Sequence, residues 1–276
     1  MFEDTTKVLY HKNCNDGLAA AGIFYKFNPN IEYIAYQHGD NFFIKNQVIL
    51  ILDLSLPKKQ LNNLLKYNKI YIVDHHLPTE KIIDLIKIPN KIYYDVFKCG
   101  SMILWDILFP EEEAPLILSY INDRDLWLNE KDYHNEMADG LELEEKSVKN
   151  FSKLIYNCSA DYFQLILERG IIIRKNTNKI VKQLESKSYI KKYNFENKMY
   201  NVIYCNSPIL QNDLGNYLVN NNLVDFAAIY YYNGYKTIFS LRGKNKVNLC
   251  EIAQYYGGGG HFNAAGCSID GIVLSL

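Results

Sequence analysis

The stretch IYIVDHH, residues 70–76, passes directly from apolar, β-branched residues to an aspartate and two histidines. Its first half is typical of a buried strand, and its last three side chains are of types that bind metal ions. The run ILILD at 49–53 has the same character and ends in a single aspartate. Both stretches therefore predict strands that end in chemically active polar groups.

Strand and helix patterns alternate on both sides of this stretch. We predict strands over residues 7–11, 31–36, 47–53, 69–74 and 91–95. Helical spacing of apolar residues lies between them, over 18–27, 57–67 and 80–86. Repeated strand–helix–strand units indicate a parallel sheet with helices on both faces.

The rest of the chain changes character twice. Helices are predicted from Gly100 onward, and the region from about 128 to 188 is mostly helical, ending in a long helix over 161–187. Further on we predict strands over 199–205, 226–232 and 237–242, and helices over 209–219 and 249–255. The predicted fold class is α/β: an N-terminal parallel sheet flanked by helices (1–130), a helical linker (131–190) and a smaller C-terminal α/β domain with a mixed sheet (191–276).

Composition and charge exclude several classes of protein. The 276 residues carry a formal net charge of -1, so we expect a nucleic-acid partner to be short and do not expect a long duplex. The six cysteines include no CxxC pair, which favours free thiols. Neither a signal-peptide pattern nor an apolar run of about 20 residues is evident, so we expect a cytoplasmic protein without a membrane partner.

Potential metal ligands follow three of the predicted strands. His11 ends the first strand and is followed by Cys14 and Asp16, Asp53 ends another, and 74–76 end a third. Ligands of open α/β sheets bind at the carboxyl ends of the strands. An aspartate at one strand end is more often a helix N-cap, but three such clusters favour a metal site. Carboxylates with imidazoles suit manganese or iron better than magnesium alone, and two such ions can activate water for phosphoryl hydrolysis.

The IVDHH run resembles the signature of the DHH phosphoesterase family, and the other motifs follow in the family's order. In INDRDLW (121–127), Asp123 is matched to the fourth-motif aspartate, with Asp125 as the alternative. The run GGGGHFNAAG (257–266) resembles the hallmark of the DHH-associated C-terminal domain, so the resemblance spans essentially the whole chain. The positions matched to metal ligands are His11, Cys14, Asp16, Asp53, His75 and Asp123.

The resemblance also implies a role for each matched position. His11 and Asp16 would bind different ions of a two-manganese centre, with Asp53 bridging them. His75 and Asp123 would complete the second site. His76 would face the scissile phosphate, while Asp74 would orient neighbouring groups.

Cys14 departs from the family pattern, because it stands where the family normally has its first aspartate. A thiolate is a soft ligand that favours other metals, and a neutral thiol leaves the first metal site weaker.

A second group of candidate residues lies near the C-terminus. Gly258, Gly259 and Gly260 expose backbone N–H groups that can approach an anion, and Arg242 can grip a phosphate with its guanidinium fork. We expect His261 to contact substrate rather than metal, and the resemblance implies that this domain grips the substrate across a cleft facing the metals. Trp105 and Trp127 are expected in the core.

The leading functional hypothesis is a nanoRNase-like exonuclease that hydrolyses short single-stranded oligonucleotides. A cyclic or linear dinucleotide phosphodiesterase is the closest alternative. A pyrophosphatase or exopolyphosphatase ranks lower, because Arg242, Lys244 and Lys246 are few charges for so dense an anion. A non-catalytic nucleotide-binding regulator is motivated by Cys14. The sequence leaves open whether the chain forms a homodimer.

Overall fold

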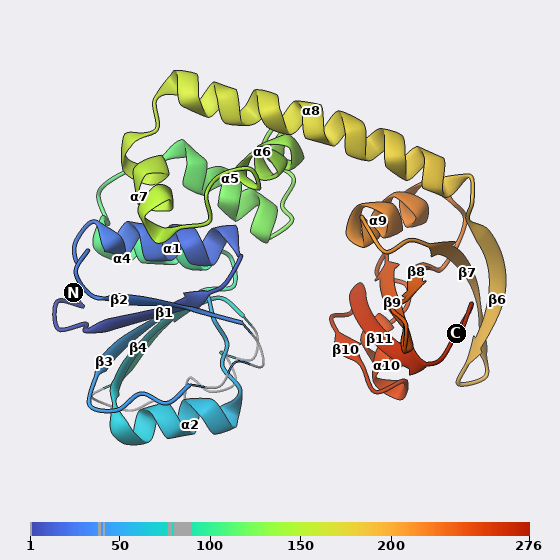
Figure 1. Ribbon diagram of the computed structural model, residues 1–276, viewed down its shortest axis with the longest axis horizontal. Coiled ribbons are helices and arrows are strands. Elements are labelled where there is room, and N and C mark those ends of the chain that lie inside the picture. The colour runs from blue at the N-terminus through green and yellow to red at the C-terminus, as the bar shows by residue number, and fades with distance from the viewer. Residues whose placement is uncertain (1, 38–39, 41, 77–78, 80–89) are drawn as a thin grey trace. The chain divides into compact units, whose positions relative to one another are not determined.

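The computed structural model describes residues 2–37, 40, 42–76, 79 and 90–276, in two compact units, Met1–Arg174 and Lys175–Leu276 (Figure 1). Each unit contains one sheet. The division falls within helix α8 (Ala160–Glu185), inside the segment that the sequence identifies as helical. The domain limits at 130 and 190 remain a prediction.

The first unit contains the predicted parallel sheet. Its five strands lie in the order β2-β1-β3-β4-β5, and every neighbouring pair is parallel. Each strand lies within two residues of its predicted limits. The strands are β1 (Lys7–His11), β2 (Glu32–Tyr36), β3 (Val48–Leu52), β4 (Lys69–Asp74) and β5 (Lys91–Tyr94).

Helices cover both faces of this sheet, as predicted (Figure 1). Alternate residues of a strand point to opposite faces, so β3 contributes Leu50 and Leu52 to one core and Ile49 and Ile51 to the other. The first core includes residues of α1 (Asn15–Tyr25) and α4 (Gly100–Leu108), and the second includes residues of α2 (Lys58–Tyr67). The helix predicted over 80–86 lies outside the described residues.

The helices that follow the sheet pack by close backbone contact. A Cβ atom on Gly170 would lie 1.7 Å from the carbonyl oxygen of Glu136, and one on Gly140 would lie 2.1 Å from that of Ile166. Only glycine allows the two helices to approach so closely. The helices of this region are α5 (Leu116–Asp125), α6 (His134–Leu141), α7 (Val148–Asn157) and α8.

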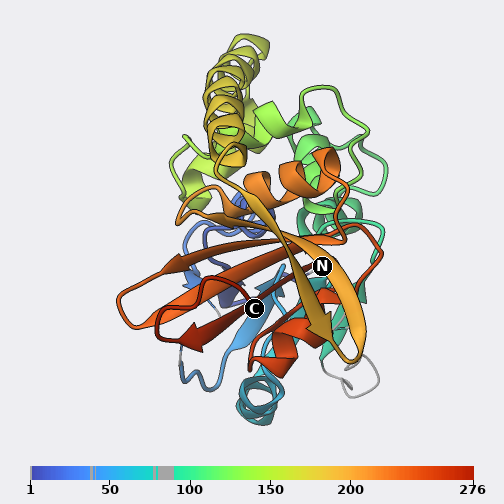
Figure 2. The ribbon, with the colours of Figure 1, turned by 90° about the vertical axis from the view of Figure 1, so that its right-hand side faces the viewer.

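The second unit is built on a six-stranded mixed sheet in the order β10-β11-β9-β8-β7-β6, in which only the β7–β8 pair is parallel. Helices α9 (Gln211–Asn221) and α10 (Leu249–Tyr255) pack on opposite faces of it (Figure 2). We predicted three of the strands and both helices. The strands are β6 (Tyr189–Phe195), β7 (Lys198–Asn206), β8 (Phe226–Tyr232), β9 (Lys236–Gly243), β10 (Gly259–Gly260) and β11 (Ala264–Asp270).

The fold class is therefore α/β, with a parallel sheet and a separate mixed sheet, as the sequence indicates. All six cysteines are free thiols. In the part of the chain that the structure describes, no helix is long and apolar enough to cross a membrane.

Candidate metal centre

The carboxyl ends of β1, β3 and β4 lie side by side, because these strands are neighbours in the sheet and run parallel. His11 therefore lies near Asp53 and near the 74–76 run. Asp53 directly follows β3 and has φ of 51°, a left-handed conformation that is uncommon outside glycine but that aspartate tolerates. Such backbone strain is found most often at functional sites.

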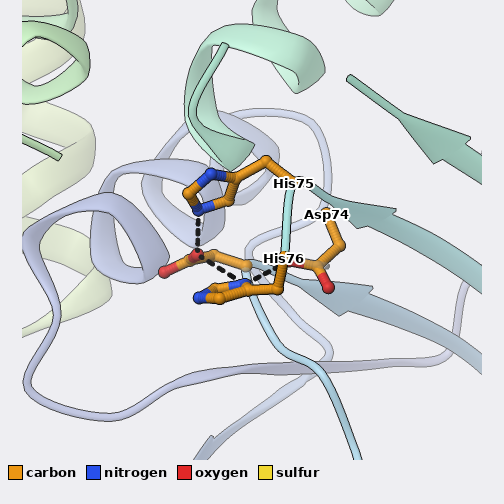
Figure 3. A group of neighbouring side chains, drawn as sticks. Asp74, His75 and His76 are labelled. Atoms are coloured by element: carbon orange, nitrogen blue, oxygen red, sulfur yellow. Dashed lines mark hydrogen bonds and ion pairs between the residues drawn. The ribbon is translucent and has the colours of Figure 1, made fainter. Parts of the chain in front are cut away.

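Asp53 is the centre of the cluster. Its Oδ1 lies 3.3 Å from His75 Nε2 and 3.8 Å from His76 Nδ1, so the two imidazoles point toward the same oxygen (Figure 3). Its Oδ2 lies 3.5 Å from His11 Nδ1. Burial by itself would raise the pKa of this fully buried carboxyl group, but His11 and His75 outweigh it and hold the pKa well below its usual value.

Asp74 fixes the orientation of the His76 imidazole. Its Oδ1 lies 2.7 Å from His76 Nδ1 (Figure 3). Its Oδ2 accepts a hydrogen bond from the Thr79 hydroxyl. The carboxylate is fully buried, so both of its oxygens are engaged within the protein. An ionised Asp74 accepts the Nδ1 proton of His76, which leaves Nε2 of that ring for another partner. The geometry is that of an orienting carboxylate.

Asp16, His75 and Asp125 form a second group whose potential ligand atoms lie within 4.8 Å of one another. His75 Nε2 lies 3.2 Å from Asp125 Oδ2. Burial lowers the pKa of His75, but the nearby Asp53 and Asp125 outweigh it and raise the pKa to about 9. Burial and the charges of Asp53 and Asp125 raise the pKa of Asp16 to about 7. The charges of this group are therefore strongly interdependent.

The N-terminus of α4 binds the Asp16 carboxylate. The backbone N–H groups of Gly100 and Ser101 donate to its two oxygens over 2.7 and 2.8 Å. The helix dipole also favours a negative charge at this end. A Cβ atom on Gly100 would lie 3.0 Å from Asp53 Cβ, so glycine suits this contact. Sequence reasoning placed Gly100 and Ser101 at a helix start but gave them no part in the site.

The structure separates the two aspartates of INDRDLW. Asp125 belongs to the group with His75, whereas Asp123 Oδ1 accepts hydrogen bonds from the backbone N–H groups of Glu130 and Lys131. The other oxygen of Asp123 lies 4.0 Å from His134 Nδ1. Among the described residues, the groups of close potential ligands include Asp125 and not Asp123. The geometry thus favours the aspartate that we took as the alternative.

Cys14 lies with His11 and Asp53 in a third group of potential ligands. It stands at the N-terminus of α1, where its side chain makes no capping hydrogen bond. Burial, with the charges of Asp53 and Asp16, raises the pKa of its thiol well above the usual value. In the absence of a cation the thiol is therefore neutral.

The donors of this centre fit a divalent metal ion. Asp53 Oδ2, His75 Nε2 and Asp125 Oδ2 are buried and make no hydrogen bond, as is also true of Asp123 Oδ2 outside the cluster, although His75 Nε2 lies 3.2 Å from Asp125 Oδ2. Buried polar atoms are nearly always hydrogen bonded, so unpaired atoms that meet at one place need an explanation. A bound cation would supply the missing partner, and mixed carboxylate and imidazole donors suit manganese or iron.

The predicted substrate-binding residues come together in the second unit. Ala264 of β11 pairs with Arg242 of β9, and the tight turn at His261 joins β10 to β11. Arg242 Nη1 donates to the carbonyl oxygen of Leu241 over 2.7 Å, and Nη2 donates to Asn212 Oδ1. Burial lowers the pKa of this guanidinium. The side chain is thus fixed beside the turn.

Two of the glycines in this turn are required by close backbone contacts. A Cβ atom on Gly258 would lie 2.1 Å from the carbonyl oxygen of Gly266. One on Gly260, which has φ of 143°, would lie 2.5 Å from Ala265 Cα. Gly259, which pairs with Gly266, has no atom within 4 Å of such a position, so no contact requires glycine there. His261 is exposed.

Comparison with known proteins gives both sequence and structure relatives. No family model matches the chain. An uncharacterized protein of Acanthamoeba polyphaga mimivirus is 32% identical over 293 residues, which cover 96% of this chain and 68% of the viral protein. The pGpG-specific phosphodiesterase of Vibrio cholerae has a TM-score of 0.55 at 15% identity, over 96% of this chain and 94% of that one. Manganese-bound exonuclease RecJ has a TM-score of 0.52 at 13% identity, over 98% and 87%.

Both solved structures are DHH-family phosphoesterases, and the likeness shows that this chain shares their two-unit α/β fold. The Asp-His-His run lies at the carboxyl end of β4, next to the carboxyl end of the parallel strand β3. The chain belongs to the same family as the viral protein, and it has the fold of the DHH phosphoesterases.

Proposed function

We propose that this protein is a manganese-dependent phosphodiesterase that hydrolyses short oligonucleotides with a metal-activated water. One observation carries the proposal: buried donor atoms of Asp53, His75 and Asp125, side chains of types that bind metal ions, converge at the carboxyl ends of the parallel strands, with both carboxylates within 3.3 Å of His75 Nε2. Buried donors of this kind, in a protein of this family, favour catalysis over a purely structural role.

The ligands of two ions can be assigned from the groups of close side chains. His11, Cys14 and Asp53 would hold the first ion, and Asp16, His75 and Asp125 the second. Asp53 lies within 3.5 Å of both His11 and His75, which suits it to bridge the two ions. When bound, the ions would supply hydroxide near neutral pH and stabilise charge on the phosphorus oxygens.

Asp125 replaces Asp123 in this proposal. The hydrogen bonds from Glu130 and Lys131 give Asp123 a structural part, namely holding the turn that follows α5. Asp74 would act as a positioning residue, since both of its oxygens bind within the protein. His76, held by Asp74 through Nδ1, would face the scissile phosphate and, with its ring protonated at both nitrogens, donate a hydrogen bond to it through Nε2.

Arg242, Gly258, Gly259, Gly260 and His261 are proposed to bind the part of the substrate away from the reacting phosphate. The fixed guanidinium of Arg242 suits a phosphate. The Gly258 N–H already donates to the Ala253 carbonyl oxygen, so the proposed part of this glycine is a close approach of the backbone to the substrate. The net charge of -1 agrees with a short substrate.

A dinucleotide phosphodiesterase is the second candidate. The similarity to a phosphodiesterase specific for pGpG, a linear dinucleotide, favours it. A pyrophosphatase remains third, since the positive charge near the glycine turn rests on Arg242, Lys244 and Lys246.

Hydrolysis assays with manganese test the proposal and rank the substrates. The panel contains RNAs of two to five nucleotides, cyclic dinucleotides and pyrophosphate. We expect turnover of the short RNAs, and a loss of at least about 1000-fold in Asp53→Asn, since this removes a shared ligand. Asp106→Asn, which changes a partly exposed carboxylate paired with Lys98, is the matched control. Absence of turnover on every substrate, with nucleotide binding retained, would support the regulatory hypothesis instead.

A further inference from the structure

A cavity of about 290 Å³ opens beside the candidate metal centre, within the first unit. The start of α1, the end of α5 with the residues that follow it, and the end of α6 with the residue after it line the cavity. Its principal lining residues are Cys14, Asn15, Asp16, Tyr120, Arg124 and Trp127.

The cavity shares residues with the metal centre. Asp16 and Asp125 line it and also belong to the group of potential ligands with His75. A phosphate bound at that group would therefore have one of its substituents next to the cavity. At about 290 Å³, the cavity is close to the lower limit of roughly 300–1000 Å³ for small-molecule pockets, so it suits a single base.

Trp127 gives the cavity an aromatic wall. We expected this residue in the core, but 54% of it is exposed, whereas Trp105 is 4% exposed and stacks on Phe109. Its backbone has φ of 55°, a left-handed conformation that is strained for a bulky residue. An exposed indole on a strained turn beside a candidate catalytic centre points to ligand contact rather than to packing.

Arg124 fixes the tryptophan and extends its surface. The guanidinium carbon lies 4.2 Å from the centre of the Trp127 ring, and Nη1 donates to Asn135 Oδ1 over 2.9 Å. Planar guanidinium and indole groups both stack on nucleobases. The two side chains thus form one aromatic and cationic platform.

Asn15 of α1 and Glu142, which follows α6, supply polar groups for the edge of a base. Asn15 Nδ2 donates to Glu142 Oε1 over 3.1 Å, and Lys146 Nζ donates to Asn15 Oδ1 over 2.6 Å. Asn15 and Glu142 both line the cavity. Their oxygens can accept hydrogen bonds from the amino and imino groups of a base, while Lys146 neutralises the carboxylate.

We propose that this cavity binds one nucleobase of the substrate, stacked on the platform of Trp127 and Arg124 beside the phosphodiester. The inference deepens the proposed function and rests on it for the phosphate that the base accompanies. It assigns substrate recognition to the first unit as well as to the glycine turn of the second.

Tryptophan fluorescence tests this assignment without any need for catalysis. The chain has two tryptophans, one buried and one in the cavity, so a base that stacks on Trp127 should quench the exposed one. The probes are AMP and GMP in the presence of Mg²⁺, which contain no phosphodiester to hydrolyse. Ribose 5-phosphate is the matched probe without a base. We expect saturable quenching by the nucleotides and none by ribose 5-phosphate.

Variants extend the test to binding affinity. Trp127→Phe should abolish the quenching, because Trp105 is shielded in the core. Trp127→Ala should weaken nucleotide affinity in calorimetry by about 5- to 150-fold, the range for loss of one stacked base. Tyr235→Ala, which removes an 83% exposed aromatic ring from the β8–β9 hairpin, should leave affinity unchanged.

The outcomes separate this inference from the proposed function. Unchanged nucleotide affinity in Trp127→Ala, or equal quenching by ribose 5-phosphate, would overturn the base-binding assignment even if short RNAs are hydrolysed. Base-dependent quenching in a protein that hydrolyses none of the substrates would uphold the cavity and overturn the phosphodiesterase.

Discussion

Two aspartates of one short motif can be distinguished by exchanging a single atom in each. Asp125→Asn removes a carboxylate oxygen that lies 3.2 Å from His75 Nε2, whereas Asp123→Asn changes a side chain that accepts hydrogen bonds from Glu130 and Lys131. Both substitutions keep the size of the side chain. If Asp125 is the metal ligand, only the first should weaken stabilisation by manganese.

The size of this effect follows from the length of the unit that binds the ion. Manganese at about 100 times its Kd stabilises the folded state by about 2.7 kcal/mol. The first unit spans Met1–Arg174, so at roughly 2.1 cal/mol/K per residue its unfolding entropy is about 0.37 kcal/mol/K. Manganese should then raise its Tm by about 7 °C.

Mutation of a residue that only supports a metal ligand can lower metal affinity by roughly 100-fold. Loss of a direct ligand should therefore lower manganese affinity by at least that factor. At the same manganese concentration the remaining stabilisation is about 0.4 kcal/mol, so the shift in Tm falls to about 1 °C. Asp123→Asn should lower the starting Tm by weakening the turn after α5, but should keep the full shift of about 7 °C on adding manganese.

Differential scanning calorimetry of the three proteins, with manganese and with a chelator, measures both quantities. The comparison uses the shift within each variant, so a difference in starting stability does not affect it. A full shift in Asp125→Asn, together with a lost shift in Asp123→Asn, would refute the reasoning and restore the assignment made from the motif alone.

Three further predictions concern other parts of the protein. Cys14→Asp should raise manganese affinity about 10-fold in calorimetry, because a carboxylate is a harder donor than a thiol; an unchanged affinity would place Cys14 outside the centre. Arg242→Lys should raise KM about 10-fold with little change in kcat, because it keeps the charge but loses the fork; a fall in kcat alone would contradict its binding role. Gly170→Ala should lower the free energy of unfolding in urea by about 1–3 kcal/mol, because its Cβ would lie 1.7 Å from the Glu136 carbonyl oxygen; unchanged stability would disprove that contact.

The strands of the first unit were predictable because their signal is local. Each is a short apolar run, and the periodicity of the helices between them indicates the parallel arrangement. In the second unit, β10 is two glycines and β11 begins with Ala264, Ala265 and Gly266, so these strands carry little β propensity. They exist because β11 pairs with β9, a strand more than 20 residues earlier in the chain, and β10 in turn pairs with β11.

Sequence alone determined that potential ligands such as His11, Asp53 and His75 stand at strand ends, since a strand end is visible in a few consecutive residues. Only the tertiary structure shows that Asp125, and not Asp123, lies in the group with His75. Asp123 and Asp125 are two positions apart in α5, so their side chains point in directions about 200° apart around the helix axis. The packing of α5 therefore determines which of them lies near His75. The tertiary structure also shows that Trp127 is exposed and lines a cavity with Asp16 and Asp125. The sequence could not predict this, because the exposure of a side chain depends on segments that are distant along the chain.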